Sequence, residues 1–238
     1  MTEMLVANTF PGTLPAVNLL IPPLENGDCL TRSEFERRYQ AMPALKKAEL
    51  IEGVVYMASP VRVKSHGRPH AQLMGWLGVY CAATPGTDLA DNATLRLDPD
   101  NEPQPDAMLW IEGGQSFISD DDYVEGAPEL VVEIAASSAS YDLHHKLKIY
   151  RRNGIQEYLV WSVLDRELHW FQLVEEKYQR QMPGADGIIE SQVYPGLRLN
   201  VMALLAGRLR QVLADLQDGL ASEAHAAFVR QLAAARHI

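Results

Sequence analysis

The sequence predicts an α/β fold in which helices flank a mixed central sheet. Its 238 residues, 47% of them hydrophobic, are sufficient for the core of one domain of this class. Predicted helices and strands alternate along the chain, which favours a sheet of mixed direction. The short apolar run at residues 130–135 is typical of a central strand covered on both faces.

Three segments are expected to make up this domain. Residues 1–30 carry four prolines and no sustained hydrophobic period, which predicts an extended N-terminal arm. Residues 31–200 hold the alternating helices and strands of the α/β domain. Residues 201–238 are predicted to be a helical extension of the same domain.

The first helix is predicted to follow Thr31, which forms a capping box with Glu34, and to stop at Pro43. The residues after it change to β-branched and aromatic types, which predicts a strand at 54–58. The sequence therefore begins the domain with one helix and one strand.

Pro69 is suited to the first turn of a second helix, in which apolar residues recur at helical spacing up to residue 83. Strands are predicted at 93–97 and 107–111. The acidic, proline-containing turn at 98–103 favours a hairpin-like return between these two strands.

A polar loop is predicted at 113–127, before the central strand. The elements expected after it are the strand 130–135, a helix at 141–153 closed by Gly154, and antiparallel strands at 155–163 and 167–174 with a turn at 164–166.

Alanine and leucine recur at helical spacing from residue 201, with a break at 219–222, which predicts two C-terminal helices. Their apolar stripe consists of Val201, Leu204, Leu205, Leu209, Val212 and Leu216. We expect this stripe to contribute to a homodimer, because a two-fold assembly can present one site to each strand of a duplex. The alternative is that the stripe packs back on the sheet.

Composition excludes several classes of protein. With 21 basic and 31 acidic residues the formal charge is −10, so a nucleic-acid site must be local, assisted by a metal or supplied by a partner. No apolar run is long enough to span a bilayer, and no secretory signal is visible, which predicts a cytoplasmic protein without a membrane partner. Two cysteines are too few for a disulfide scaffold.

Two carboxylates are candidates for a metal site. Asp106 stands at the head of one predicted strand, and Glu133 lies among valine and isoleucine in the central one. A buried carboxylate is costly to ionise without a cation or hydrogen-bond donors. Mg²⁺ prefers oxygen ligands and is the natural candidate, whereas a simple ion pair of Glu133 with Lys or Arg is the alternative.

The helix after the central strand offers a cationic side chain. Asp142, Lys146 and Tyr150 are four residues apart and share one stripe, whereas Lys148 is expected to face solvent. Lys146 is therefore the better candidate for a functional lysine. The alternative is an ordinary Asp142–Lys146 pair on the helix surface.

Several motifs resemble the Uma-two endonuclease family of the PD-(D/E)xK nuclease superfamily. The resemblance covers about residues 49–163 and continues more weakly to about 199. The motifs, in order, are Glu49-Leu-Ile-Glu-Gly, the histidine His66, Pro105-Asp106, Pro128-Glu-Leu-Val-Val-Glu-Ile134, Asp142-x-x-x-Lys146-x-x-x-Tyr150 and Gly154-Ile-Gln-Glu-Tyr158.

The resemblance implies a restriction endonuclease-like core and a set of roles. Asp106 and Glu133 would bind Mg²⁺ or Mn²⁺, Glu49 would add an acidic ligand from a preceding helix, and Lys146 would be the counterpart of the superfamily lysine. His66 matches a family histidine and would contact a phosphate or water at the edge of the substrate site, although a structural role at the start of its helix is equally expected. The implied partner is DNA.

The histidines His66 and His70 do not favour zinc, because Gly67 and Pro69 lie between them and the pair need not share a helix face. The expected function is hydrolysis of phosphodiester bonds by a Mg²⁺-dependent endonuclease. The alternative is a catalytically inactive binding module on the same fold.

Overall fold

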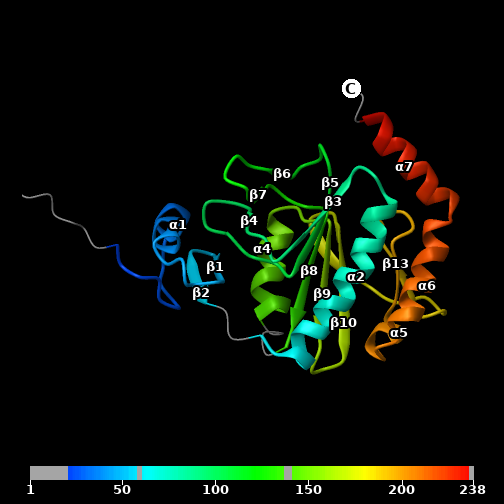
Figure 1. Cartoon of the computed structure of the whole chain (residues 1–238), viewed down its shortest axis with the longest axis horizontal. Helices are drawn as coiled ribbons and strands as arrows, with labels where there is room; N and C mark the ends of the chain where they lie inside the picture. Colours follow the sequence, from blue (N-terminus) through cyan, green and yellow to red (C-terminus); the bar gives the residue numbers. More distant parts are fainter. Residues whose placement is uncertain (1–20, 58–60, 137–140, 236–238) are drawn as a thin grey trace, which may run out of the picture.

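A six-stranded mixed sheet forms the centre of the protein in the computed structural model, which describes residues 21–57, 61–136 and 141–235. The strand order is β11-β10-β9-β8-β5-β3, and only β8 and β9 are parallel neighbours (Figure 1). The strands are β3 (Thr87–Asp91), β5 (Ala107–Ile111), β8 (Leu130–Ala135), β9 (Glu157–Ser162), β10 (Glu167–Val174) and β11 (Lys177–Gln181). The mixed α/β class predicted from the sequence is confirmed.

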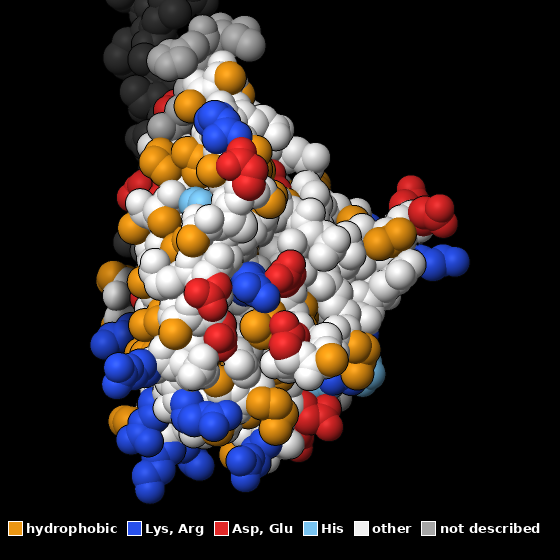
Figure 2. Space-filling view, turned by 90° about the vertical axis from the view of Figure 1, so that its right-hand side faces the viewer, with side chains coloured by type: hydrophobic (Ala, Val, Ile, Leu, Met, Phe, Trp, Pro, Cys, Tyr) orange, Lys and Arg blue, Asp and Glu red, His pale blue; other side chains and the backbone are white. Residues whose placement is uncertain are grey.

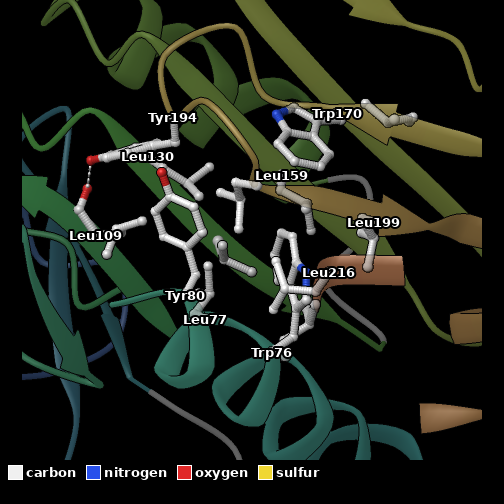
Figure 3. Close-up of a cluster of buried hydrophobic side chains, with 14 of the residues drawn as sticks. Trp76, Leu77, Tyr80, Leu109, Leu130, Leu159, Trp170, Tyr194, Leu199 and Leu216 are labelled. Carbon is white, nitrogen blue, oxygen red and sulfur yellow. Dashed lines mark hydrogen bonds between the residues drawn. The ribbon is translucent and has the colours of Figure 1, made fainter. Parts of the chain in front are cut away.

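Strand β8 is covered on both faces, as its apolar sequence predicts. Leu130, Val132 and Ile134 pack into one hydrophobic cluster, and Val131 and Ala135 pack into a second cluster on the other face. The first cluster also contains Trp76 and Trp170, whose rings meet edge to face with centroids 5.9 Å apart (Figure 3). Glu133 is the one charged residue of the strand and lies on the face of the second cluster.

Helices cover the two faces unequally. α2 (Arg68–Ala83) lies on the first face with the C-terminal helices α5 (Val201–Leu205), α6 (Leu209–Leu220) and α7 (Glu223–Ala235) (Figure 1). The opposite face carries α4 (Leu147–Arg152), which is preceded by the π-helical turn η2 (Asp142–Lys146). A second π-helical turn, η1 (Val63–Gly67), leads into α2.

The C-terminal stripe packs back on the sheet. Val201, Leu204, Val212 and Leu216 are buried in the first cluster, and Leu205 and Leu209 pack against it. This packing matches the alternative that the sequence left open. The stripe is therefore covered within the chain. Three helices are present where two were expected, because the segment 206–208 also interrupts the helical run.

A smaller unit precedes the sheet. α1 (Arg32–Gln40) and the hairpin β1 (Ala48–Ile51) and β2 (Val54–Met57) enclose a third cluster around Phe35 and Leu50. Backbone bonds from Gly27 to Val55 and from Leu30 to Gly53 attach residues 21–30 to the hairpin. Residues 1–20 of the predicted arm lie outside the described residues.

Two expectations for this unit were wrong. The sequence did not predict β1 as a strand. In the structure β1 and β2 form a hairpin, and Glu52 and Gly53 take the positive φ angles of its tight turn. Thr31 precedes α1 but its side chain makes no capping bond. The expected capping box is absent because Glu34 pairs with Arg37 and Arg38, at 2.7 and 2.6 Å.

The expected pairing of strands 93–97 and 107–111 was also wrong. The chain does turn back after β4 (Leu95–Arg96), with bonds from Leu97 N to Asn101 O and from Leu95 N to Pro103 O. Proline has no N–H to extend that ladder, and Pro103 and Pro105 follow in the returning segment. β5 instead pairs with β3 and β8, and β3 itself was missed.

Short strands account for the remaining elements. β4 pairs with β7 (Val124–Glu125), which also pairs with β6 (Phe117–Ile118), in the segment predicted to be a polar loop. β12 (Ile188–Glu190) pairs with β13 (Arg198–Asn200). Among the described residues, no helix has the length and apolar character needed to cross a bilayer.

The buried C-terminal stripe predicts that the helices are required for folding. Leu216→Ala should lower the free energy of unfolding by about 2–5 kcal/mol, because it removes a fully buried side chain from the main core. Urea denaturation measures this loss, with Met202→Ala, at a 64% exposed position of the same region, as the control. A truncated chain lacking residues 201–238 that folds cooperatively would contradict this packing role.

Candidate active site

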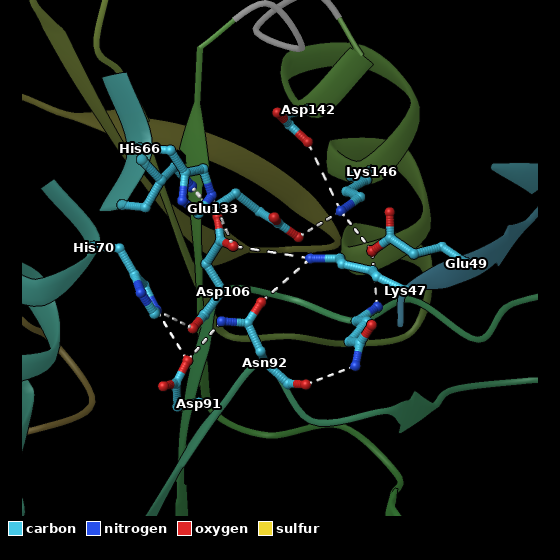
Figure 4. A network of polar contacts seen from close by, with 12 residues as sticks. Lys47, Glu49, His66, His70, Asp91, Asn92, Asp106, Glu133, Asp142 and Lys146 are labelled. Carbon is cyan, nitrogen blue, oxygen red and sulfur yellow. Dashed lines mark hydrogen bonds and ion pairs between the residues drawn. The ribbon is translucent and has the colours of Figure 1, made fainter. Parts of the chain in front are cut away.

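The candidate site lies at the C-terminal end of β8, on the face covered by α4 (Figure 4). β5 and β8 run antiparallel with Ala107 opposite Val132. Continuing this register by one residue places Asp106 opposite Glu133, with both side chains on the same face of the sheet. The sheet therefore brings together two carboxylates that are 27 residues apart in the sequence.

Lys146 connects the carboxylates that surround it. Its Nζ donates to Glu133 Oε1 at 2.8 Å and to Glu49 Oε1 at 2.9 Å, and lies 3.8 Å from Asp142 Oδ1. Tyr150 OH donates to the same oxygen of Glu133 at 2.9 Å. The three partners of Lys146 come from β1, β8 and η2, and Tyr150 comes from α4; Lys146 itself is 3% exposed.

Burial dominates the electrostatics of this cluster. Desolvation raises the pKa of Glu133 to about 8; the charges of Asp142, Asp106 and Glu49 add to this rise and Lys146 opposes it. The pKa of Lys146 rises well above its usual value, because the attraction of Glu133, Glu49 and Asp142 outweighs desolvation. Lys146 is therefore an ammonium ion at neutral pH, whereas burial and the neighbouring carboxylates disfavour the charged form of Glu133.

Asp106 is held by a separate set of contacts. Its Oδ2 accepts a 2.6 Å bond from Ile134 N, and its Oδ1 lies 3.1 Å from His66 Nε2 and 3.8 Å from Lys47 Nζ. Burial disfavours the charged form of Asp106, but these contacts outweigh it and hold its pKa below the usual 3.8. Asp106 is thus a fixed, ionised carboxylate beside Glu133.

A series of polar contacts supports the Glu49 side chain and the backbone at Asp106. His70 Nε2 lies 2.9 Å from the backbone oxygen of Asp106 and 3.0 Å from Asp91 Oδ1. Gln104 connects Glu49 with Asn92, because its N donates to Glu49 Oε1 at 2.8 Å and its Nε2 donates to Asn92 O at 2.7 Å. These contacts fix the position of the segment that leads into β5.

The structure brings together all the residues that the sequence singled out. Lys146 shares its face with Asp142 and Tyr150, whereas the Lys148 side chain is 60% exposed and pairs with Glu52. Glu49 joins the cluster from strand β1. The prediction that a helix carries Glu49 was therefore wrong, because the segment 48–57 forms a hairpin whose first strand points Glu49 inward.

The histidines lie closer together than the sequence suggested. The rings of His66 and His70 are 5.8 Å apart and both contact Asp106, so the π-helical turn before α2 brings them to one side. Sequence reasoning missed Lys47, which is two residues before Glu49 and would have been found had β1 been predicted, since alternate residues of a strand share a face. Asp91, Asn92 and Gln104 had no sequence signal.

The charges of the cluster suit a divalent cation. Among the described residues, Glu49, Asp106, Glu133 and Asp142 lie beside the ammonium groups of Lys47 and Lys146, so the carboxylates outnumber these cations once Glu133 is ionised. Carboxylate oxygens are the ligands that Mg²⁺ prefers. Within the described ranges no three His, Cys, Asp or Glu side chains form a ready-made metal site, because Lys146 lies between Glu49 and Glu133.

Comparison with known proteins places this arrangement in a family. The family model Uma2, described as "Putative restriction endonuclease", matches residues 32–202. The chain belongs to the Uma2 family. The match begins at α1 and ends within α5, so it spans the candidate site and the whole central sheet of this Uma2 protein.

A solved structure shares the fold of this Uma2 chain. It is the crystal structure of a "putative nuclease belonging to DUF820" from Anabaena variabilis ATCC 29413, with 12% identity and a TM-score of 0.52. The similarity covers 77% of this chain and 97% of that one. A search of curated proteins found no match. The restriction endonuclease-like fold expected from the sequence is confirmed.

The raised pKa of Glu133 predicts an unusual dependence of stability on pH. Because its pKa of about 8 in the folded protein exceeds the ordinary value of 4.5, ionisation of Glu133 destabilises the fold as the pH rises between these values. In the presence of a chelator, ionisation of Glu133 should lower the free energy of unfolding by up to about 1.4 kcal/mol per pH unit between these two pKa values.

Urea denaturation of the wild type and Glu133→Gln at pH 5 to 8.5 measures this cost. Glutamine cannot ionise, so the variant should gain stability relative to the wild type as the pH rises. Burial also raises the pKa of Glu102 to about 8, but that group is present in both proteins and cancels in the comparison. A difference between the two proteins that is constant with pH would contradict the electrostatic analysis.

Proposed function

We propose that this protein is an endonuclease that hydrolyses phosphodiester bonds of DNA with the help of Mg²⁺ or Mn²⁺. The family description and the nuclease fold support a nuclease. The observation that carries the proposal is the convergence of Glu49, Asp106 and Glu133 around Lys146 at one end of the sheet. Metal-assisted hydrolysis of a phosphodiester uses acidic ligands to hold the cation, and a fixed positive charge stabilises the negative charge that develops on the phosphate.

Each residue then has a role in the reaction. Glu49, Asp106 and Glu133 would hold the cation, which lowers the pKa of water and neutralises charge on the phosphate. Lys146 remains protonated, so it would orient the attacking water and donate a hydrogen bond to a phosphate oxygen instead of removing a proton. His66 and the Ile134 N–H keep Asp106 in place, and Tyr150 orients Glu133.

The alternative is a binding module that does not cleave. It is favoured by the position of Lys146, which satisfies Glu49 and Glu133 without a metal ion. A nicking assay on supercoiled DNA separates the two functions. An endonuclease converts the plasmid to nicked and linear forms with Mg²⁺ or Mn²⁺ and does not cleave it in the presence of a chelator. A binding module retards the plasmid in the gel but leaves it supercoiled under both conditions.

The buried lysine and the exposed lysine of the same helix make a matched pair of variants. Lys146→Met should lower the rate of cleavage at least about 100-fold, because it removes the positive charge that contacts Glu49 and Glu133. Lys148→Met should keep most of the activity, since Lys148 pairs with Glu52 outside the cluster. Initial rates of plasmid nicking measure both effects, and equal losses would remove Lys146 from the mechanism.

A divalent cation should stabilise the folded protein. At a concentration ten times its dissociation constant, Mg²⁺ bound only to the folded state adds about 1.4 kcal/mol, or roughly 3–6 °C in Tm for a chain of this size. Thermal melts with Mg²⁺ and with chelator measure the shift. Asp106→Asn should reduce it, and a wild-type Tm that does not change with Mg²⁺ would contradict the metal site.

Two further expectations stay predictions. A cytoplasmic location follows from the sequence alone. A homodimer also stays a prediction, and its interface would have to use surfaces other than the apolar stripe of α5 and α6, which is buried within the chain.

A further inference from the structure

A pocket of about 160 Å³ lies between the start of α2, the end of β9 and α5. Its apolar lining includes Trp161, Leu204 and Leu205, and its basic lining consists of Lys64, Arg68 and Arg166. In Figure 2, Lys and Arg side chains gather with hydrophobic ones at the lower end of the molecule, the end where Figure 1 places the start of α2 and α5. The pocket thus combines an apolar floor with a positive rim.

The three cations of the rim form no ion pair with a described residue. All three are exposed, whereas the buried Arg96 is neutralised within the chain and lies within 3.0 Å of Glu36, Asp121 and Glu125. Asp165 and Glu167 flank Arg166 in the sequence, but the Glu167 carboxylate contacts His169 at 3.3 Å. In a chain of formal charge −10, an unpaired group of three cations is suited to an external anion.

The pocket lies at the same end of the sheet as the candidate active site. Lys64 and His66 belong to the same π-helical turn, and His66 contacts Asp106 at 3.1 Å. On the other side, Trp161 of β9 lies opposite Ile134 of β8, next to Glu133. Trp161 and Ile134 pack on the α2 face, whereas Glu133 faces α4. A nucleic-acid strand that crosses this end of the sheet would contact first the pocket and then the candidate active site.

We propose that this pocket holds an unstacked nucleotide of the substrate strand, close to the phosphodiester that is cleaved. This inference rests on the proposed nuclease function and specifies its substrate as a strand with an unpaired base beside the cleavage position. The rim of Lys64, Arg68 and Arg166 binds the flanking phosphates. The apolar floor receives the base.

The apolar floor is the reason to prefer an unstacked nucleotide over duplex backbone. Bases in a duplex are stacked inside it and reach a pocket only when they are flipped out at an energetic cost, so a duplex that keeps its stacking presents only phosphates and sugars. Grooves for single strands instead combine backbone cations with apolar or aromatic surfaces for the bases. Two exposed apolar residues beside the pocket extend this surface: Val63 is 72% exposed and precedes Lys64, and Leu164 is 66% exposed and precedes Asp165.

The test measures binding in chelator, so that it does not depend on cleavage. Fluorescence anisotropy with a labelled 12-nucleotide single-stranded DNA compares the wild type with Lys64→Gln/Arg68→Gln/Arg166→Gln. The control, Lys148→Gln/Lys177→Gln/Arg230→Gln, removes the same charge from exposed positions on other surfaces. The pocket variant should bind at least about tenfold more weakly and lose about two units of salt slope, whereas the control should change affinity less than threefold.

An abasic site moved along the oligonucleotide tests for a base in the pocket. One position should lower wild-type affinity about tenfold, and a duplex of the same sequence should be less sensitive to the pocket variant. Equal losses in both triple variants, no sensitive abasic position, equal sensitivity of the duplex, or no binding by the wild type would each overturn the proposal.

A parallel nicking assay separates this proposal from the proposed function. Metal-dependent cleavage without pocket-dependent binding overturns the pocket and leaves the endonuclease. Pocket-dependent binding without cleavage supports the pocket as the site of a binding module and removes the endonuclease.

Discussion

The burial of four carboxylates near one end of the sheet is the constraint on which the site depends. Lys146 contacts Glu133, Glu49 and Asp142, and it is as deeply buried as they are. Burial, together with the charges of the neighbouring carboxylates, outweighs its ammonium group, and the pKa of Glu133 rises to about 8. Removing one partner of a buried ion cluster leaves charge without compensation, which costs more than the cluster contributes as a whole. A site of this kind is expensive to keep for stability alone, and this cost favours a functional interpretation.

Backbone geometry sets the positions of these charges. The register of β5 and β8 places Asp106 beside Glu133, and the N–H of Ile134 binds Asp106 directly. The four-residue spacing of η2 and α4 aligns Lys146 with Tyr150, so that both donate to one oxygen of Glu133. Because the strands and the helix are held by the two hydrophobic clusters, the core positions the charged groups before any ligand binds.

An acidic chain can act on a polyanion only where its charge is locally reversed. The carboxylates of the candidate site repel a phosphate until a cation joins them, and the free cations of Lys64, Arg68 and Arg166 lie on the other face of the same sheet end. Under the proposed function, attraction of a nucleic-acid strand and activation of the reacting phosphate would fall to neighbouring but separate surfaces. Such a separation would make a formal charge of −10 compatible with the proposed nucleic-acid substrate.

Local patterns in the sequence were sufficient to predict the α/β class, the bounds of β8 and the stripe of Asp142, Lys146 and Tyr150, because period and burial preference act within a few residues. They could not determine that Glu49 lies on a strand, that β5 leaves its apparent hairpin partner, or that the C-terminal stripe covers the sheet. The contacts of Lys47, His70 and Gln104 were equally hidden. Each of these outcomes depends on segments far apart in the chain, and only the tertiary structure decides which of several chemically acceptable partners a strand, an apolar face or a buried charge obtains.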